Sequence, residues 1–207
     1  MRTELKYHIK KDRVPKLKVS LVRNSFFQSF DKRNVNSLYF DDLKQNAFHD
    51  NIEGNLQRVK KRFRWYDNLS DNNSVFLEVK KKNDINGEKI KNKIIVGKGN
   101  IVNHDFIMQL NDKINFLYNV KYTPMVISSY SREYFENIEG IRATIDTNLR
   151  FIDPKSFHKK TFEYDILEIK FPKDSFPNLC FLKNLDTLLT KNSKYAIGVD
   201  KLYFNKT

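Results

Sequence analysis

The stretch from Arg58 to Tyr66 constrains the fold of this chain more than any other. It reads Arg-Val-Lys-Lys-Arg-Phe-Arg-Trp-Tyr, and alternate residues of a β-strand point to opposite faces. The second face is mostly apolar, and the first carries only cations, namely Arg58, Lys60, Arg62 and Arg64. By itself such a row is typical of a solvated strand face. Because neighbouring cations repel, its recurrence in other strands would instead indicate a surface for an extended polyanion.

The same alternation does recur. Eight segments are predicted as strands, with boundaries at Glu4–Ile9, Asn34–Asp41, Leu56–Tyr66, Val75–Lys82, Glu88–Val96, Met125–Phe135, Ile141–Asn148 and Phe162–Phe171. Cations dominate most of their polar faces, with scattered glutamates among them. An ordinary half-exposed sheet mixes both signs on its wet face, so this excess favours an anion-binding surface.

Helices are predicted where apolar residues recur at helical spacing, over Val14–Phe30, Asp42–Asn51, Asp105–Tyr118 and Leu179–Thr190. About eight strands joined by short turns favour an antiparallel sheet or a closed barrel. The helices would pack on the apolar strand faces, which leaves the charged faces lining the interior. We therefore predict an α+β fold: an antiparallel eight-stranded β-barrel with helices packed outside, a basic tunnel inside, and a single domain over residues 1–207.

The overall charge agrees with an anionic partner. The chain has 38 Lys+Arg against 25 Asp+Glu, a formal net charge of +13, and such a field attracts nucleic acid, phosphorylated compounds or acidic membranes. Cys180 is the only cysteine, which excludes an intrachain disulfide and a thiolate metal cluster, and we expect it in the core. The sequence shows no signal peptide and no apolar run near the ~20 residues of a membrane helix. We expect a soluble cytoplasmic protein without a transmembrane segment.

A basic tunnel suits a linear phosphate chain, because Arg offers forked donors to phosphate oxygens and Lys a point charge. Glu168 and Glu78 lie among these cations. Mg²⁺ or Mn²⁺ is often bound through one or two carboxylates together with substrate phosphates. Charge balance with neighbouring lysines is the alternative for both carboxylates, and it is the favoured interpretation for Glu78.

Nucleic acid is not expected as a partner. A duplex cannot enter a barrel of about eight strands. Single strands usually need aromatic side chains on the basic face, whereas the aromatic residues here are predicted on the opposite face, at Phe63, Trp65, Phe76 and Phe135.

The chain resembles the VTC domain, the polyphosphate polymerase branch of the triphosphate tunnel metalloenzymes (the CYTH-like superfamily). The matching segments occur in family order and span nearly the whole chain. They are Glu4-Leu5-Lys6-Tyr7, Val35-Asn36-Ser37-Leu38-Tyr39-Phe40-Asp41, Arg62-Phe63-Arg64-Trp65-Tyr66, Phe76-Leu77-Glu78-Val79-Lys80, Lys89-Ile90-Lys91, Ser129-Tyr130-Ser131-Arg132, Arg142-Ala143-Thr144-Ile145-Asp146, Leu167-Glu168-Ile169-Lys170 and Lys191-Asn192-Ser193-Lys194-Tyr195.

The resemblance implies a set of site residues. Phosphate ligands would be Lys6, Arg62, Arg64, Lys80, Lys91, Arg132, Arg142 and Lys170, with a hydroxyl from Tyr130. The late basic motif would add Lys191, Ser193 and Lys194. Glu168 would hold the divalent metal, Mn²⁺ or Mg²⁺. The residues placed closest to the reaction would be Arg62, Arg64, Lys80, Arg132 and Arg142.

The resemblance also implies an activity. The chain would be a metal-dependent phosphotransferase, a polyphosphate polymerase that transfers the γ-phosphate of ATP to a growing polyphosphate chain inside the basic tunnel. Two alternatives stay open: a triphosphate-hydrolysing tunnel phosphatase, and a non-catalytic module that binds polyphosphate or nucleic acid. The tunnel phosphatases carry a Glu-x-Glu-x-Lys pattern, and here only Glu4 precedes Lys6 at that spacing, which disfavours hydrolysis.

Overall fold

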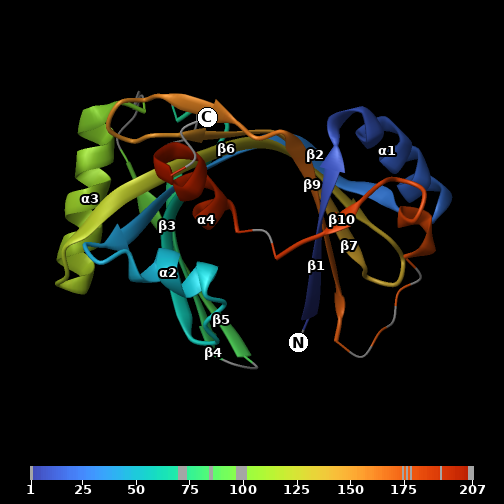
Figure 1. Ribbon diagram of the computed structural model, residues 1–207, viewed down its shortest axis with the longest axis horizontal. Coiled ribbons are helices and arrows are strands. Elements are labelled where there is room, and N and C mark those ends of the chain that lie inside the picture. The colour runs from blue at the N-terminus through green and yellow to red at the C-terminus, as the bar shows by residue number, and fades with distance from the viewer. Residues whose placement is uncertain are drawn as a thin grey trace. The chain divides into compact units, whose positions relative to one another are not determined.

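The strands form one sheet whose hydrogen-bonded order is β10-β1-β9-β7-β6-β2-β3-β4-β5, with β8 paired to β7 (Figure 1). The computed structural model describes residues 2–69, 74–83, 86–96, 102–173, 175, 177, 179–191 and 193–204. The strands are β1 Arg2–Lys10, β2 Phe27–Asp42, β3 Arg58–Tyr66, β4 Ser74–Asn83, β5 Asn86–Ile95, β6 Tyr122–Glu136, β7 Arg142–Ile152, β8 Lys159–Thr161, β9 Tyr164–Pro172 and β10 Leu188–Leu189.

The helices are α1 Val14–Arg23, α2 Asn46–Ile52, α3 His104–Tyr118 and α4 Lys194–Val199. Short 3₁₀ turns lie at Lys11–Arg13 and Cys180–Leu182, and a π-helical turn at Asp200–Phe204. The predicted α+β fold with an antiparallel sheet is confirmed. Among the described residues the strand order is open, with β10 and β5 at its ends, where a closed eight-stranded barrel was expected. No described helix has both the length and the hydropathy to span a membrane.

The chain divides into two compact units. Unit 1 comprises Met1–Asn34, Tyr130–Leu149 and Thr161–Asn192, and unit 2 comprises Val35–Ser129, Arg150–Lys160 and Ser193–Thr207. The strands β2, β6, β7 and β8 each contribute residues to both units. The expectation of a single domain over residues 1–207 stays a prediction.

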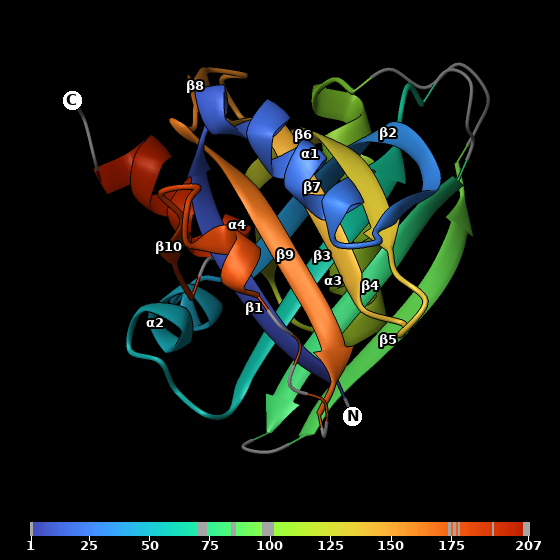
Figure 2. The ribbon, with the colours of Figure 1, turned by 90° about the vertical axis from the view of Figure 1, so that its right-hand side faces the viewer.

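In unit 1, helix α1 covers the apolar face of β1, β7 and β9 (Figure 2). Leu17 and Leu21 are fully buried in one cluster with the apolar residues of those strands. The predicted helix Val14–Phe30 was too long. It ends at Arg23, because the Asn24 N–H bonds to the carbonyls of Ser20 and Leu21 and Ser25 adopts a left-handed φ of 62°.

In unit 2, helix α3 covers the apolar face of β3 and β4 (Figure 1). Asn103 caps the helix by accepting the Phe106 N–H at 2.9 Å. The buried stripe follows the predicted spacing, with Phe106, Ile107, Leu110 and Ile114 packed on Phe63, Trp65, Val75 and Leu77. Leu117, at the last turn, lies outside this stripe and is 50% exposed.

The predicted helix over Leu179–Thr190 was wrong. One 3₁₀ turn at Cys180–Leu182 is followed by β10, which pairs with Tyr7 and His8 of β1. Leu182 and Leu185 are buried in the core of unit 1, and their spacing suggested a helix. The chain instead turns at Asp186, whose φ is 48°. Cys180, expected in the core, is exposed.

Candidate active site

The strand register gives unit 2 a continuous basic face. Residues directly opposite each other in neighbouring strands point to the same face. Three rows run across β3, β4 and β5 in this way: Lys60, Lys80 and Lys89; Arg62, Glu78 and Lys91; Arg64, Phe76 and Lys93. We call these residues the basic face. Helix α3 packs on the other side of the same strands, so the alternation predicted for Arg58–Tyr66 is confirmed.

Glu78 is the carboxylate at the centre of the basic face. The Arg62 side chain donates to its Oε2 at 2.7 Å and 2.9 Å, Lys89 Nζ donates to Oε1 at 3.0 Å, and Arg64 Nη1 lies 3.7 Å from Oε2. Glu78 is 3% exposed. Burial opposes its ionisation, but Arg64, Arg62 and Lys89 outweigh this effect and lower its pKa to about 2. These contacts favour charge balance, the alternative weighed above, over a metal ligand.

The two arginines are also held from β2. Arg62 Nη1 donates to Tyr39 Oη at 2.8 Å, and Arg64 Nε donates to Ser37 Oγ at 3.1 Å. Burial raises the pKa of the Tyr39 hydroxyl, but Arg62, Arg64 and other nearby cations reverse the effect and leave the pKa lowered. Donors fixed in this way bind an anion without reorganisation.

Phe76 lies on the basic face and not on the apolar face where it was predicted. It stands opposite Arg64 in the register, and Lys91 Nζ lies 4.0 Å from its ring centroid. Its position follows from strict alternation with Glu78, whereas the prediction followed its hydrophobicity. Lys80 and Lys91 are exposed on the same face.

The late basic motif is divided between the units. Ser193 and Lys194 belong to unit 2, where Lys60 Nζ donates to Ser193 Oγ at 3.0 Å and the charge of Lys194 helps to lower the pKa of Tyr39. Lys191 belongs to unit 1 and is exposed, beside Thr190, whose N–H donates to the Lys6 carbonyl at 2.8 Å. Lys60 and Tyr39 were absent from the expected site residues, although their alternation with Arg62 and Ser37 was visible in the sequence.

Unit 1 carries an alternating array of charges. Lys6 stands opposite Glu168, and Glu4 opposite Lys170. Lys170 Nζ lies 2.5 Å from Glu168 and 3.8 Å from Glu4, and Lys6 Nζ lies 2.7 Å from Glu4 and 3.7 Å from Glu168. The third strand, β7, adds Arg142 opposite Lys170; the Arg142 side chain is half exposed, and its Nε lies 3.1 Å from Glu136. Four of the expected site residues are therefore neighbours here.

Arg132 is the most strongly held cation of unit 1. It binds Asp146 through two hydrogen bonds of 2.5 Å and 2.7 Å, and its guanidinium lies 5.3 Å from the Tyr130 ring centroid. Burial disfavours its charge, but the fully buried Asp146 outweighs this effect and raises the pKa of Arg132 well above its usual value. Arg132 and Tyr130 are thus brought together as expected, with Asp146 as an additional partner.

A divalent cation fits the donors beside Glu168. The described residues hold no group of three or more His, Cys, Asp or Glu side chains suited to a metal, yet Glu168 and Glu4 share one face, and Mg²⁺ commonly uses one or two carboxylates plus substrate phosphates. Thr144 stands opposite Glu168. Its Oγ1 is buried and has no hydrogen-bond partner among the described residues, so a hard oxygen donor lies next to the carboxylate.

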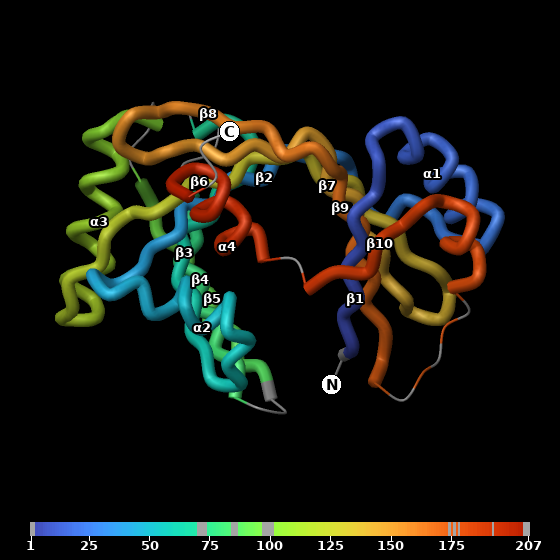
Figure 3. The backbone as a smooth tube through the Cα atoms, viewed as in Figure 1, coloured from blue at the N-terminus to red at the C-terminus, as the bar shows by residue number. Residues whose placement is uncertain are grey.

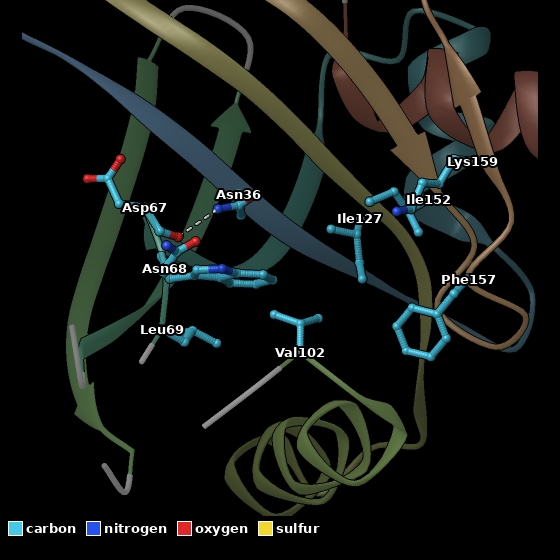
Figure 4. A pocket seen from close by; sticks show the side chains of 10 residues that line it. Asn36, Asp67, Asn68, Leu69, Val102, Ile127, Ile152, Phe157 and Lys159 are labelled. Atoms are coloured by element: carbon cyan, nitrogen blue, oxygen red, sulfur yellow. Dashed lines mark hydrogen bonds between the residues drawn. The ribbon is translucent and has the colours of Figure 1, made fainter. Parts of the chain in front are cut away.

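A cavity of about 380 Å³ in unit 2 has a different character (Figure 4). It lies on the apolar side of β3, where Trp65, Ile127, Val102 and Phe157 line it, and Asn36 donates to the Asp67 carbonyl at its edge. Among the described residues that line it, Lys159 is the one cation. The cations converge instead on the basic face, which is the opposite face of β3.

The strand order and the helices on the apolar faces define the class of protein: the chain has the triphosphate tunnel (CYTH-like) fold. The Hippeastrum protein HpAC1 superposes with a TM-score of 0.57 at 14% identity, covering 97% of this chain and 96% of that chain. The PH1819 protein of Pyrococcus horikoshii gives 0.55 at 18% identity, with 97% and 99% covered. The family model of the VTC domain matches residues 1–203, so the chain belongs to the VTC domain family. A comparison with curated proteins finds no match.

Proposed function

We propose that this chain is a polyphosphate polymerase, which transfers the γ-phosphoryl group of ATP to the end of a growing polyphosphate with the help of a divalent cation. The observation that supports it best is the composition of the basic face. Its rows across β3, β4 and β5 hold one carboxylate, Glu78, among many cations. A linear chain of phosphates matches such an array of fixed charges better than a compact anion does.

The reaction needs little covalent chemistry from the protein. A terminal phosphate oxygen of the acceptor chain forms a bond to the γ-phosphorus of ATP, and the bond from that phosphorus to the β–γ bridging oxygen breaks, which releases ADP. Arg62 and Arg64 would bind equatorial phosphate oxygens, because their guanidinium groups are already oriented by Glu78, Tyr39 and Ser37. They would also reduce the repulsion between the two anions.

Glu168 is proposed as the metal ligand. Its carboxylate would hold Mn²⁺ or Mg²⁺ together with Glu4 and the Thr144 hydroxyl, for which the described part of the chain offers no hydrogen-bond partner. When bound, the cation supplies charge neutralisation and polarisation at phosphate oxygens. Lys6 and Lys170, which now contact Glu168, would then be available to bind phosphate. Arg132 and Arg142 are proposed as further phosphate ligands.

Hydrolysis of a triphosphate is the second candidate. HpAC1, which shares this fold, is described as having a dominant triphosphatase activity. The same residues would grip the substrate, with water as the acceptor. Glu4 lies on the same face as Glu168, so a second carboxylate is present even though the Glu-x-Glu-x-Lys pattern is incomplete.

The deciding experiment incubates the purified chain with ATP and Mn²⁺ and measures polyphosphate on stained gels, ADP and free phosphate. We expect long polymer and stoichiometric ADP, and loss of both in the Glu168→Gln variant. Free phosphate without polymer would replace the polymerase with the hydrolase. Tight polyphosphate binding without either product would indicate a binding module.

Neighbouring lysines of β4 offer a matched control. Lys80 stands opposite Lys60 on the basic face, whereas Lys81 stands opposite Val59 on the other face. We expect Lys80→Gln to lower kcat/KM for ATP at least tenfold and Lys81→Gln to change it less than twofold. Equal effects would show that general charge, and not the basic face, binds the substrate.

A further inference from the structure

A buried tyrosine joins the C-terminal segment of unit 2 to β2. Tyr195 belongs to α4, which lies beside α2 (Figure 3). The Tyr195 side chain is 2% exposed. Its ring stacks on Tyr39 with centroids 5.5 Å apart and meets the Phe48 ring edge at 6.5 Å. Tyr195 therefore packs directly against a residue of β2 that binds Arg62.

The Tyr195 hydroxyl donates to Asp41 at the end of β2. The Asp41 carboxylate is 2% exposed and also accepts the N–H groups of Ala47 at 3.0 Å and Phe48 at 2.9 Å. A buried carboxylate requires such donors. Burial raises the pKa of Tyr195 and Asp41 raises it further, so the hydroxyl keeps its proton at neutral pH. One carboxylate thus joins β2, the first turn of α2 and α4.

Helix α4 is too short to be stable by itself, so tertiary contacts fix its position, and this is one of them. It has only 6 residues, and isolated helices shorter than about 12 residues are marginal in water. The two residues before Tyr195 are Ser193, which accepts from Lys60, and Lys194, whose charge reaches Tyr39. Both belong to the late basic motif.

We propose that Tyr195 is a positioning residue, which acts through Asp41 to hold Lys194 and Ser193 beside the basic face so that they bind a phosphate chain. This inference rests on the proposed function only in that the basic face binds phosphates. It requires no turnover. Tyr195 itself does not touch the ligand.

The test measures binding of tripolyphosphate by calorimetry over a range of salt concentrations. Tyr195→Phe keeps the ring stacking and removes the hydroxyl. We expect its Kd to rise about tenfold, which is typical of one lost hydrogen bond to a charged group. The slope of log K against log salt should fall by about one charge, because Lys194 no longer contributes.

A double-mutant cycle separates positioning from general destabilisation. If Tyr195 acts through Lys194, Lys194→Gln will weaken binding strongly in the wild-type background and little in the Tyr195→Phe background. Tyr203→Phe is the matched control, because its hydroxyl donates to the Met125 carbonyl at 2.8 Å and to Asp153 at 3.2 Å, and neither acceptor belongs to the late basic motif or the basic face. It should lower stability without changing the salt slope.

The outcomes are distinct. Unchanged binding by Tyr195→Phe, or additive effects in the cycle, would overturn the positioning role and leave the proposed function intact. Wild-type binding without polymer synthesis, with the cycle non-additive, would overturn the polymerase and leave the positioning role intact. Absence of wild-type binding would overturn both.

Discussion

Neutralising Glu78 is the sharpest test of how the basic face is held together. The pKa of Glu78 falls from 4.5 to about 2 in the folded chain. Each pKa unit corresponds to about 1.4 kcal/mol, so the ionised carboxylate contributes about 3 kcal/mol to the free energy of unfolding at neutral pH. Glu78→Gln should lose about that amount, because it leaves Arg62, Arg64 and Lys89 without their counter-charge.

The stabilisation by the Glu78 carboxylate should decrease as the pH falls. A carboxyl whose pKa is depressed by folding stabilises fully above its unfolded pKa and loses the effect as pH falls through the folded value. The difference between wild type and Glu78→Gln should therefore be about 3 kcal/mol at pH 7 and about 1.4 kcal/mol at pH 3. Trp65, the only tryptophan, is buried in the core of unit 2 and reports urea unfolding by fluorescence.

Two controls make this test decisive. Glu88→Gln removes an exposed carboxylate from β5, on the opposite sheet face, and should change stability by less than about 0.5 kcal/mol. Tripolyphosphate should restore more stability to Glu78→Gln than to wild type, since the ligand replaces the missing negative charge. A difference between wild type and Glu78→Gln that stays constant from pH 7 to pH 3 would refute this account of Glu78.

Three further substitutions test the packing of α4 and α3 and the Arg132–Asp146 ion pair of unit 1. A Cβ at Gly198 would lie 2.7 Å from the Phe151 ring, so Gly198→Ala should lower the free energy of unfolding by about 1–3 kcal/mol, measured by urea titration. Leu110→Ala leaves a cavity on the buried side of α3 and should lower the free energy of unfolding by about 2–5 kcal/mol. A loss below about 1 kcal/mol would contradict the packing of that helix. Asp146→Asn leaves Arg132 buried without its counter-charge and should lower the melting temperature, with partial recovery in tripolyphosphate; an unchanged melting curve would argue against the pair.

Strand faces were predictable because their period is short. In Arg58–Tyr66, a period of two assigns every side chain to a face once one is known, and the structure keeps that assignment. The partners across the sheet required the register, which the sequence does not contain. That Glu78 stands opposite Arg62, and Tyr39 opposite the same arginine, is a property of strand pairing. The contact of Tyr39 with Arg62 could therefore not be predicted, whereas Lys60 was already visible on the cationic face of Arg58–Tyr66.

The wrong helix predictions came from apolar residues at helical spacing, which irregular segments can also show. Leu182 and Leu185 are three residues apart and buried, which is compatible with a helix and equally with an irregular segment anchored at two points. The left-handed residues Ser25 and Asp186 end or exclude helices locally, and neither is a glycine that would have marked the turn. At the predicted helix Asp42–Asn51, the carboxylates of Asp41 and Asp42 accept the first N–H groups of α2.

Several boundaries between the two units fall inside continuous strands, at residues 34/35 in β2, 129/130 in β6 and 149/150 in β7. Neither unit can therefore be produced by truncating the gene at one point, because each contains three separate stretches of the chain. Swapping one half between homologues would require simultaneous exchange of segments scattered along the sequence. Recombination is thus expected to preserve this chain as an indivisible genetic module.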